Sequence, residues 1–193
     1  MGRNEKSLSE SYKFRKYFLR GDTVIFVTVG THEQPFNRLV EYIDELKKNG
    51  KIEEEIIIQT GYSTYQPQYC EWKKLYPYQD MIKLVERARI VITHGGPSSF
   101  IMPLQIGKTP IVVPRQYKFG EHVNDHQVAF VTEVANRMGT IIAVTDIEKL
   151  EDTINRYDSI IKEMHGNTNS NNAKFNNELE NIVKDMFKEK FDD

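Results

Sequence analysis

Apolar residues follow two patterns along this chain of 193 residues. Short, mostly β-branched runs predict buried strands at residues 24–29, 55–59, 90–93, 109–114 and 140–144, and residues 72–76 are a weaker candidate for a short strand. Between the runs, apolar residues recur at helical spacing and predict helices at residues 36–48, 80–88, 100–106 and 128–138. A last helix is expected to begin at Thr145–Asp146 and to keep Ile161 on its apolar face. This alternation predicts an α/β fold, a Rossmann-like parallel sheet flanked by helices.

Residues 90–115 form the central unit of the pattern: a strand, a polar loop, a helix and a second strand. Such a unit is a βαβ crossover, and loops at the carboxyl ends of its strands are where open α/β sheets bind ligands. Gly95 and Gly96 would let the backbone approach a ligand closely, and N–H groups at the helix start can hold an anion. A tight strand-to-helix turn without a ligand is the alternative interpretation of this glycine pair.

Composition and charge narrow the class of protein. An apolar fraction of 39% and a charged fraction of 28% are typical of a soluble globular protein, and the net charge of −2 does not favour nucleic acid as a partner. One cysteine, Cys70, excludes an internal disulfide and a cysteine-based metal cluster. No apolar run approaches the ~20 residues of a membrane span, and residues 1–22 lack the apolar core of a signal peptide.

The sequence predicts that the chain consists of four parts: an extension, a domain, a linker and a helix. Residues 1–22 are a basic N-terminal extension, either an unstructured leader or a membrane-surface contact made by basic and aromatic side chains. Residues 23–165 form the Rossmann-like domain, and residues 166–172 are a linker of small polar residues. Residues 173–193 carry a helical apolar stripe that either covers the domain or docks on a partner.

Other site chemistries lack their sequence patterns. His122 and His126 are the only histidine pair at metal-ligand spacing, and no HExxH-type motif joins them, so no metal site is predicted. The segment after Gly96 lacks the second glycine of a hydrolase nucleophile elbow, and Gly30 is the only glycine where a dinucleotide fingerprint needs three. What remains is a nucleotide or phosphorylated ligand held by N–H and hydroxyl groups of Gly95, Gly96, Ser98, Ser99 and Thr31.

Several segments, in order and at matching spacing, resemble the C-terminal donor-binding half of family 28 glycosyltransferases. They are VTVGTHEQPFNRLV from residue 27, YQDM near residue 80, VITHGGPSSFIMPLQIGKTPIVVPRQ from residue 91 and NDHQ from residue 124, and the resemblance covers residues 24 to about 145. The chain is most similar to stand-alone donor-binding subunits of two-chain capsule and exopolysaccharide transferases, and to the eukaryotic subunit that transfers GlcNAc onto dolichol-linked GlcNAc. The resemblance implies the C-terminal half of a GT-B enzyme, with a second, membrane-anchored chain as the acceptor-binding half.

The resemblance also implies roles for particular residues. The two glycine turns would face the diphosphate of a UDP-sugar, residues 78–81 would hold uracil through their backbone, and residues 124–127 would contact the sugar. The implied donor-binding residues are Gly30, Thr31, Tyr78, Gln79, Met81, Gly95, Gly96, Pro97, Ser98, Ser99, Asn124, Asp125, His126 and Gln127. His32 and His94 are the catalytic candidates for contact with phosphate or acceptor, and the identity of the general base stays open because the other half closes the cleft.

The activity implied is inverting transfer of a hexose from UDP to a lipid-linked saccharide during capsule or exopolysaccharide synthesis. Galactose in a β-1,4 linkage is the expected sugar, without a metal or other cofactor, since the UDP-sugar is itself the substrate. The chain is expected in the cytoplasm, recruited to the inner face of the cell membrane by its partner. One position departs from the family pattern: Met102 stands where many relatives place a ribose-binding glutamate. That departure leaves open a non-catalytic nucleotide-sugar-binding or regulatory partner as the alternative.

Overall fold

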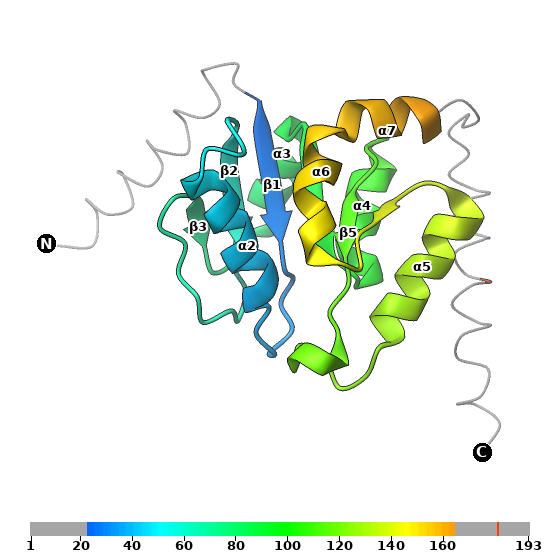
Figure 1. The fold of residues 1–193 in the computed structure, drawn as a ribbon, viewed down its shortest axis with the longest axis horizontal. Helices are drawn as coiled ribbons and strands as arrows, with labels where there is room; N and C mark the ends of the chain where they lie inside the picture. Colours follow the sequence, from blue (N-terminus) through cyan, green and yellow to red (C-terminus); the bar gives the residue numbers. More distant parts are fainter. Residues whose placement is uncertain (1–22, 165–180, 182–193) are drawn as a thin grey trace, which may run out of the picture.

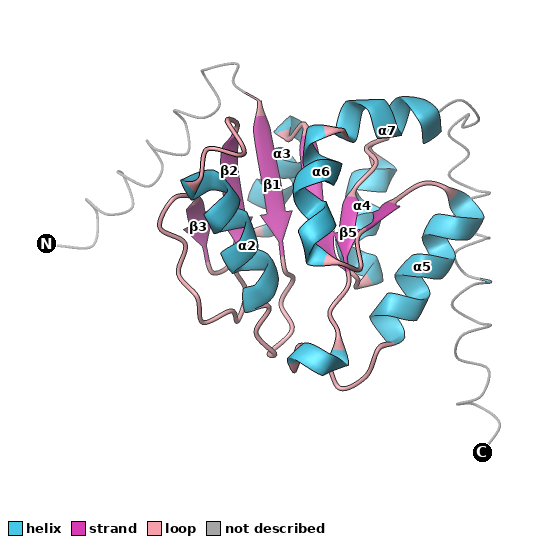
Figure 2. Ribbon diagram, in the orientation of Figure 1, coloured by secondary structure: helices cyan, strands magenta, loops and turns pink. Residues whose placement is uncertain are grey.

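A computed structural model describes residues 23–164 and residue 181 of the chain. The predictions for residues 1–22, 166–172 and 173–193 lie outside these residues, except for the single position 181. The described part is a six-stranded sheet in the order β3-β2-β1-β4-β5-β6, with every neighbouring pair of strands parallel (Figures 1 and 2). The predicted fold class is therefore confirmed.

The elements follow one another along the chain as an alternation of strands and helices. The strands are β1 (Val24–Thr28), β2 (Glu55–Gln59), β3 (Glu71–Lys73), β4 (Ile90–His94), β5 (Ile111–Val113) and β6 (Ile142–Ala143). The helices are α2 (Asn37–Lys48), α3 (Tyr78–Arg87), α4 (Pro97–Gln105), α5 (His126–Met138), α6 (Leu150–Asn155) and α7 (Tyr157–Met164), with 3₁₀ turns η1 (Tyr117–Phe119) and η2 (Ile147–Lys149).

The sheet is buried on both faces, which explains why its strands are continuous apolar runs in the sequence. In β1, Ile25 and Val27 pack with the helices α2 and α6 that lie in front of the sheet in Figure 1. Val24 and Phe26 pack on the other face with α3. Each strand thus contributes alternate residues to two apolar layers.

Several element boundaries predicted from the sequence need correction. The short strand is Glu71–Lys73 and not 72–76, because the chain turns after Lys73 toward Tyr76, whose N–H donates to the buried amide oxygen of Gln59 at 3.0 Å. Helices α4 and α5 begin two or three residues earlier than their apolar residues indicate, at Pro97 and His126, since their first turns are polar. Proline is well suited to such a helix start because its φ is already helical.

The last predicted helix is divided into η2, α6 and α7. Its apolar face is correct, because Leu150, Ile154 and Tyr157 are buried in the layer that also contains α2. The chain leaves α-helical geometry at Arg156, and Tyr157 then donates its hydroxyl to the carbonyl of Thr109 at 2.7 Å. Helical periodicity alone does not record such a long-range bond.

Asp44 of α2 holds the long loop that precedes β3. Its buried carboxylate accepts N–H bonds from Gln68 and Tyr69 at 2.8 Å and from Cys70 at 3.0 Å, and the hydroxyl of Tyr65 at 2.8 Å. Burial by itself raises the pKa of Asp44, but the donated bonds outweigh it, and the net shift is downward. A carboxylate that the folded state keeps charged therefore fixes the 62–70 loop on the helix.

Replacing Asp44 by asparagine should lower the free energy of unfolding by about 2–3 kcal/mol at neutral pH, because an amide group cannot accept all four bonds. Since the folded-state pKa is lowered, this stabilisation is present above the unfolded pKa of about 3.9 and is lost as the pH falls through the folded value. Urea unfolding of both proteins between pH 7 and pH 3 measures the difference. The exposed Asp152→Asn is the control, and equal stability of the Asp44 variant and the natural chain at pH 7 would contradict the role of this carboxylate.

Candidate functional site

The order of strands reverses between β1 and β4, which are neighbours in the sheet although β2 and β3 lie between them in the chain. At such a switch point the connections leave in opposite directions and open a crevice at the carboxyl ends of the strands. Gly30 and Thr31 follow β1, and Gly95–Ser99 follow β4. The carboxyl end of β1 points to the lower edge of Figure 1, where the loops of residues 29–36 and 114–125 also lie. The topology therefore brings both predicted glycine turns to one crevice.

His94 is the last residue of β4, at the switch point, and is only 8% exposed. The N–H of Gly96 donates to its Nδ1 at 3.0 Å, so the ring proton is on Nε2, which lies 2.6 Å from Oγ of Ser99. Burial, with the charge of Arg115 as the next cause, lowers the pKa of His94 to about 4. The imidazole is therefore neutral and has both nitrogens engaged inside its own turn. In this structure the catalytic candidate His94 shapes the turn.

The two glycine turns pack directly on the His94 ring. A Cβ atom on Gly96 would lie 2.3 Å from Cε1 of His94, and one on Gly30 would lie 2.3 Å from Nε2. Gly30 also has a φ of +75°, in the left-handed region that favours glycine. The tight-turn interpretation of the sequence is thus correct for the packing, and it leaves the N-terminus of α4 at the switch point, with Pro97 and Ser98 exposed.

A buried polar network joins the Gly30 turn to the segment before α3. The side-chain amide of Gln59 accepts from the N–H of Tyr76 at 3.0 Å and donates to Oγ1 of Thr28 at 3.1 Å. The same hydroxyl accepts from the N–H of Gly30 at 3.3 Å. Gln59 and Thr28 were not predicted as site residues, and they align the carboxyl ends of β1 and β2.

The uracil segment forms the first turn of α3. The N–H groups of Asp80 and Met81 donate to the carbonyl of Pro77, so the helix itself uses the backbone donor of Met81. Tyr78 and Gln79, at the very start of the helix, keep N–H groups that a helix does not pair internally. Tyr78 is 65% exposed, whereas the side chain of Met81 is partly buried against the α3 layer.

Arg115 braces the loops on either side of the crevice, and sequence reasoning gave it no role. It is fully buried, and its guanidinium donates to the carbonyl oxygens of Val29, Gln34, Pro35 and Glu121 at 2.8–3.3 Å. Burial lowers the pKa of Arg115 to about 10, so it stays charged at neutral pH. The loops after β1 and β5 are therefore held to one cation.

The predicted sugar-contacting residues also hold the β5 loop in place. Asn124 accepts the N–H of His126 on Oδ1 at 3.2 Å, and Asp125 accepts the N–H of Tyr117 at 2.9 Å. Oε1 of Gln127 accepts the N–H of Arg115 at 3.2 Å and lies 3.0 Å from the position of a Cβ on Gly95. These bonds place Gln127 beside the His94 turn, at the start of α5.

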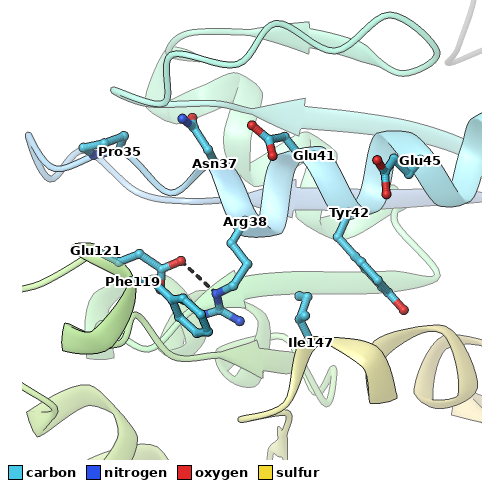
Figure 3. Close-up of a pocket in the computed structure, with 9 residues that line it drawn as sticks. All are labelled: Pro35, Asn37, Arg38, Glu41, Tyr42, Glu45, Phe119, Glu121 and Ile147. Carbon is cyan, nitrogen blue, oxygen red and sulfur yellow. Dashed lines mark hydrogen bonds and ion pairs between the residues drawn. The ribbon is translucent and has the colours of Figure 1, made fainter.

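A separate hollow of about 450 Å³ lies on the α2 side of the sheet (Figure 3). Its lining is Pro35, Asn37, Arg38, Glu41, Tyr42, Glu45, Phe119, Glu121 and Ile147. Arg38 donates through Nε and Nη2 to the two carboxylate oxygens of Glu121 at 2.8 and 2.9 Å, and its guanidinium lies 4.7 Å from the centre of the Phe119 ring. The hollow contains none of the predicted donor-binding residues.

A comparison with models of known protein families identifies the family of this chain. Residues 24–186 match the glycosyltransferase family 28 C-terminal domain. The chain belongs to this family. No curated protein matches the chain in a sequence comparison.

Solved structures agree on the fold. The family 28 domain described here is similar to the glycosyltransferase SnogD from Streptomyces nogalater, with 18% identity and a TM-score of 0.53 over 75% of this chain and 37% of that one. It is also similar to the glycotransferase of kitacinnamycin, with 17% identity and a TM-score of 0.55 over 76% of this chain and 38% of that one. The chain thus corresponds to the Rossmann-like C-terminal half of a GT-B glycosyltransferase and spans less than two fifths of these proteins.

Two further observations concern the residues that the structure describes. None of their helices is long and apolar enough to cross a membrane. Met102, at the position where many family 28 members are expected to bind ribose, is partly buried against the α3 layer, as Met81 is. An apolar side chain of α4 therefore packs toward α3 one turn after the serines.

Proposed function

We propose that this chain is the donor-binding half of a UDP-sugar-dependent glycosyltransferase. The observation that carries the proposal is the meeting of the two glycine turns and the N-terminus of α4 at the switch point between β1 and β4, in a family 28 domain. Backbone N–H groups and the positive end of a helix dipole are suited to a diphosphate. Gln127 packs on Gly95, next to these N–H groups and this helix start, so a sugar attached to the diphosphate could bind beside Gln127.

The proposed reaction is direct displacement at the anomeric carbon, with inversion. The acceptor hydroxyl forms a bond to this carbon while the bond to the β-phosphate oxygen of UDP breaks, and the UDP leaves with the bonding electrons. The start of α4 stabilises the charge that develops on the leaving diphosphate. Galactose, joined in a β-1,4 linkage to a lipid-linked saccharide of a capsule or exopolysaccharide, is the proposed product.

A second chain is part of the proposal. This chain spans 37% and 38% of the similar solved structures, and the proposal assigns the other half of a GT-B cleft to a second chain. We place that half on a membrane-anchored, acceptor-binding partner, which would recruit this chain from the cytoplasm to the inner face of the membrane. No metal or other cofactor is included in the proposed reaction.

Calorimetric titration of the full chain with UDP, UDP-Gal, UDP-Glc, UDP-GlcNAc and UDP-GlcA tests donor binding. Ser98→Glu should weaken binding by about tenfold or more, because the exposed carboxylate would face the diphosphate at the start of α4. Gln105→Glu adds the same charge at the exposed far end of the same helix and should leave the affinity unchanged. Equal affinities of the two variants, or no binding of any of the five compounds to the natural chain, would contradict the proposed site.

Met102 supports a second candidate function, that of a non-catalytic nucleotide-sugar-binding partner of a transferase. A methionine cannot accept hydrogen bonds from ribose hydroxyls as a glutamate can. Incubation with a radiolabelled UDP-sugar and membranes that contain the partner separates the two candidates. Label in the lipid fraction that depends on this chain supports the transferase, and donor binding without transfer supports the second candidate.

A further inference from the structure

The loops after β1 and β5 meet at two histidines on the crevice side of the sheet. The ring centroids of His32 and His122 are 5.4 Å apart, with 41° between the ring planes. Both histidines also lie close enough to His94, the last residue of β4, for their charges to contribute to its lowered pKa. The pair therefore lies beside both glycine turns.

The first ring of the pair is a hydrogen-bond donor. The N–H of Gln34 donates to Nδ1 of His32 at 3.2 Å, so the neutral ring carries its proton on Nε2. Burial, followed by the charges of Arg115 and His122, lowers the pKa of His32 and keeps the ring neutral. Its Nε2–H can donate to a bound oxygen.

In His122, the second ring of the pair, the proton is assigned to the other nitrogen. Oδ1 of Asn124 accepts the N–H of His126, which fixes the orientation of the carboxamide. The same oxygen lies 3.1 Å from Nδ1 of His122, and this contact is a hydrogen bond when Nδ1 carries the ring proton. The N–H of Asn124 lies 3.4 Å from the same Nδ1, a contact that suits the other tautomer, and we assign the proton to Nδ1 from the shorter contact. Nε2 of His122 then carries a lone pair.

We propose that His122 is the general base of the transfer reaction and that His32 positions the attacking hydroxyl. A donor Nε2–H beside an acceptor Nε2 matches one sugar hydroxyl, which accepts from His32 and donates to His122. As the oxygen bonds to the anomeric carbon and the bond to UDP breaks, the hydroxyl proton moves to Nε2 of His122. Asn124 is a positioning residue, because it holds His122 in the required tautomer.

The inference rests on the proposed transferase function, and one measurement is independent of it. Nitrogen chemical shifts of the histidine rings in the free full chain report the tautomers directly. The expected result is a proton on Nδ1 in His122 and on Nε2 in His32. A neutral His122 with its proton on Nε2 would overturn the proposal whether or not the chain transfers sugar.

Kinetics with the partner chain provide the second test. His122→Asn should lower kcat by about 10²–10⁴-fold, the usual range for loss of a general base, with the Kd of the UDP-sugar within about twofold. His32→Gln keeps an N–H donor and should lower kcat by no more than about tenfold. Unchanged kcat in His122→Asn, with an active natural chain, would reject His122 while leaving the proposed function intact.

The pH profile separates a base from a structural residue. Asn124→Asp puts a carboxylate against Nδ1–H of His122, which favours the charged ring and should move the acidic limb of the kcat profile to higher pH. The other charged and titratable groups around the pair, Arg115, Glu33 and His94, are unchanged in this variant. A profile that does not move would overturn the role of His122.

Discussion

Arg115→Met should lower the free energy of unfolding by about 3–5 kcal/mol, because it removes a buried cation that binds four backbone carbonyl groups. Methionine has a similar length and fills much of the same space, so the loss is one of hydrogen bonds and charge. The guanidinium also lies 4.8 Å from the centre of the Phe36 ring, a contact that the variant loses in part. Urea unfolding, followed by circular dichroism, measures the change.

The control for this prediction is Arg137→Met on the exposed side of α5. Within the described part of the chain, the salt bridge of Arg137 is with Glu133 one turn away, so its loss should change stability by no more than about 0.5 kcal/mol. Arg115→Lys should not restore the natural stability, because one ammonium group cannot reach four carbonyl groups spread over two loops. A loss below about 1 kcal/mol in Arg115→Met would show that the loops are held by other contacts.

The sheet could be predicted from the sequence because its strands are buried on both faces. Runs such as residues 24–27 and 90–92 leave no polar position on either side, and this pattern is distinctive for a parallel sheet. The glycine turns could also be predicted, since Gly30 and Gly96 stand at strand ends. Their immediate packing partner, His94, could not be identified as such, because a histidine beside two glycines also suits a ligand contact.

The residues that brace the site could not be predicted, because their partners are remote in the chain. Arg38 and Glu121 are 83 residues apart, and Arg115 and Val29 are 86 residues apart. A polar residue in a polar segment carries no signal of burial until its acceptors are known. Asp44 did leave a signal: it stands one turn after Val40 and next to Ile43, on the buried side of α2, where an unpaired carboxylate would be costly.

The starts of α4 and α5 also could not be predicted from the sequence, because their first turns are polar. Ser98, Ser99, His126 and Gln127 belong to the first turns of these helices, although periodicity assigned them to loops. A first turn that faces a crevice has no apolar residue to mark it. The position of the proposed anion site at the start of a helix follows from this correction, because Ser98 now lies in the first turn, where a helix does not pair every N–H group internally. The N–H of Ser99 donates to the carbonyl of Gly96 at 3.0 Å.

Gly96→Ala should destabilise the chain by about 1–3 kcal/mol and weaken donor binding, because the new methyl group would lie 2.3 Å from Cε1 of His94. The backbone at this position has a φ of −75° and a ψ of 130°, which alanine adopts without strain. The whole cost should therefore come from the contact with the imidazole ring. Urea unfolding of four proteins measures it: the natural chain, Gly96→Ala, His94→Ala and the double variant.

In the His94→Ala background the space next to residue 96 is open, and Gly96→Ala should then cost almost nothing. Gly30→Ala is the matched contrast, since its φ of +75° leaves a penalty of about 1–2 kcal/mol even when the ring is absent. Gly139→Ala, with a φ of +57° and no atom of residues 23–164 or residue 181 within 4 Å of the new methyl group, should show that backbone penalty alone in either background. If Gly96→Ala were equally costly with and without His94, the close packing of the ring on this turn would not be the reason for the glycine.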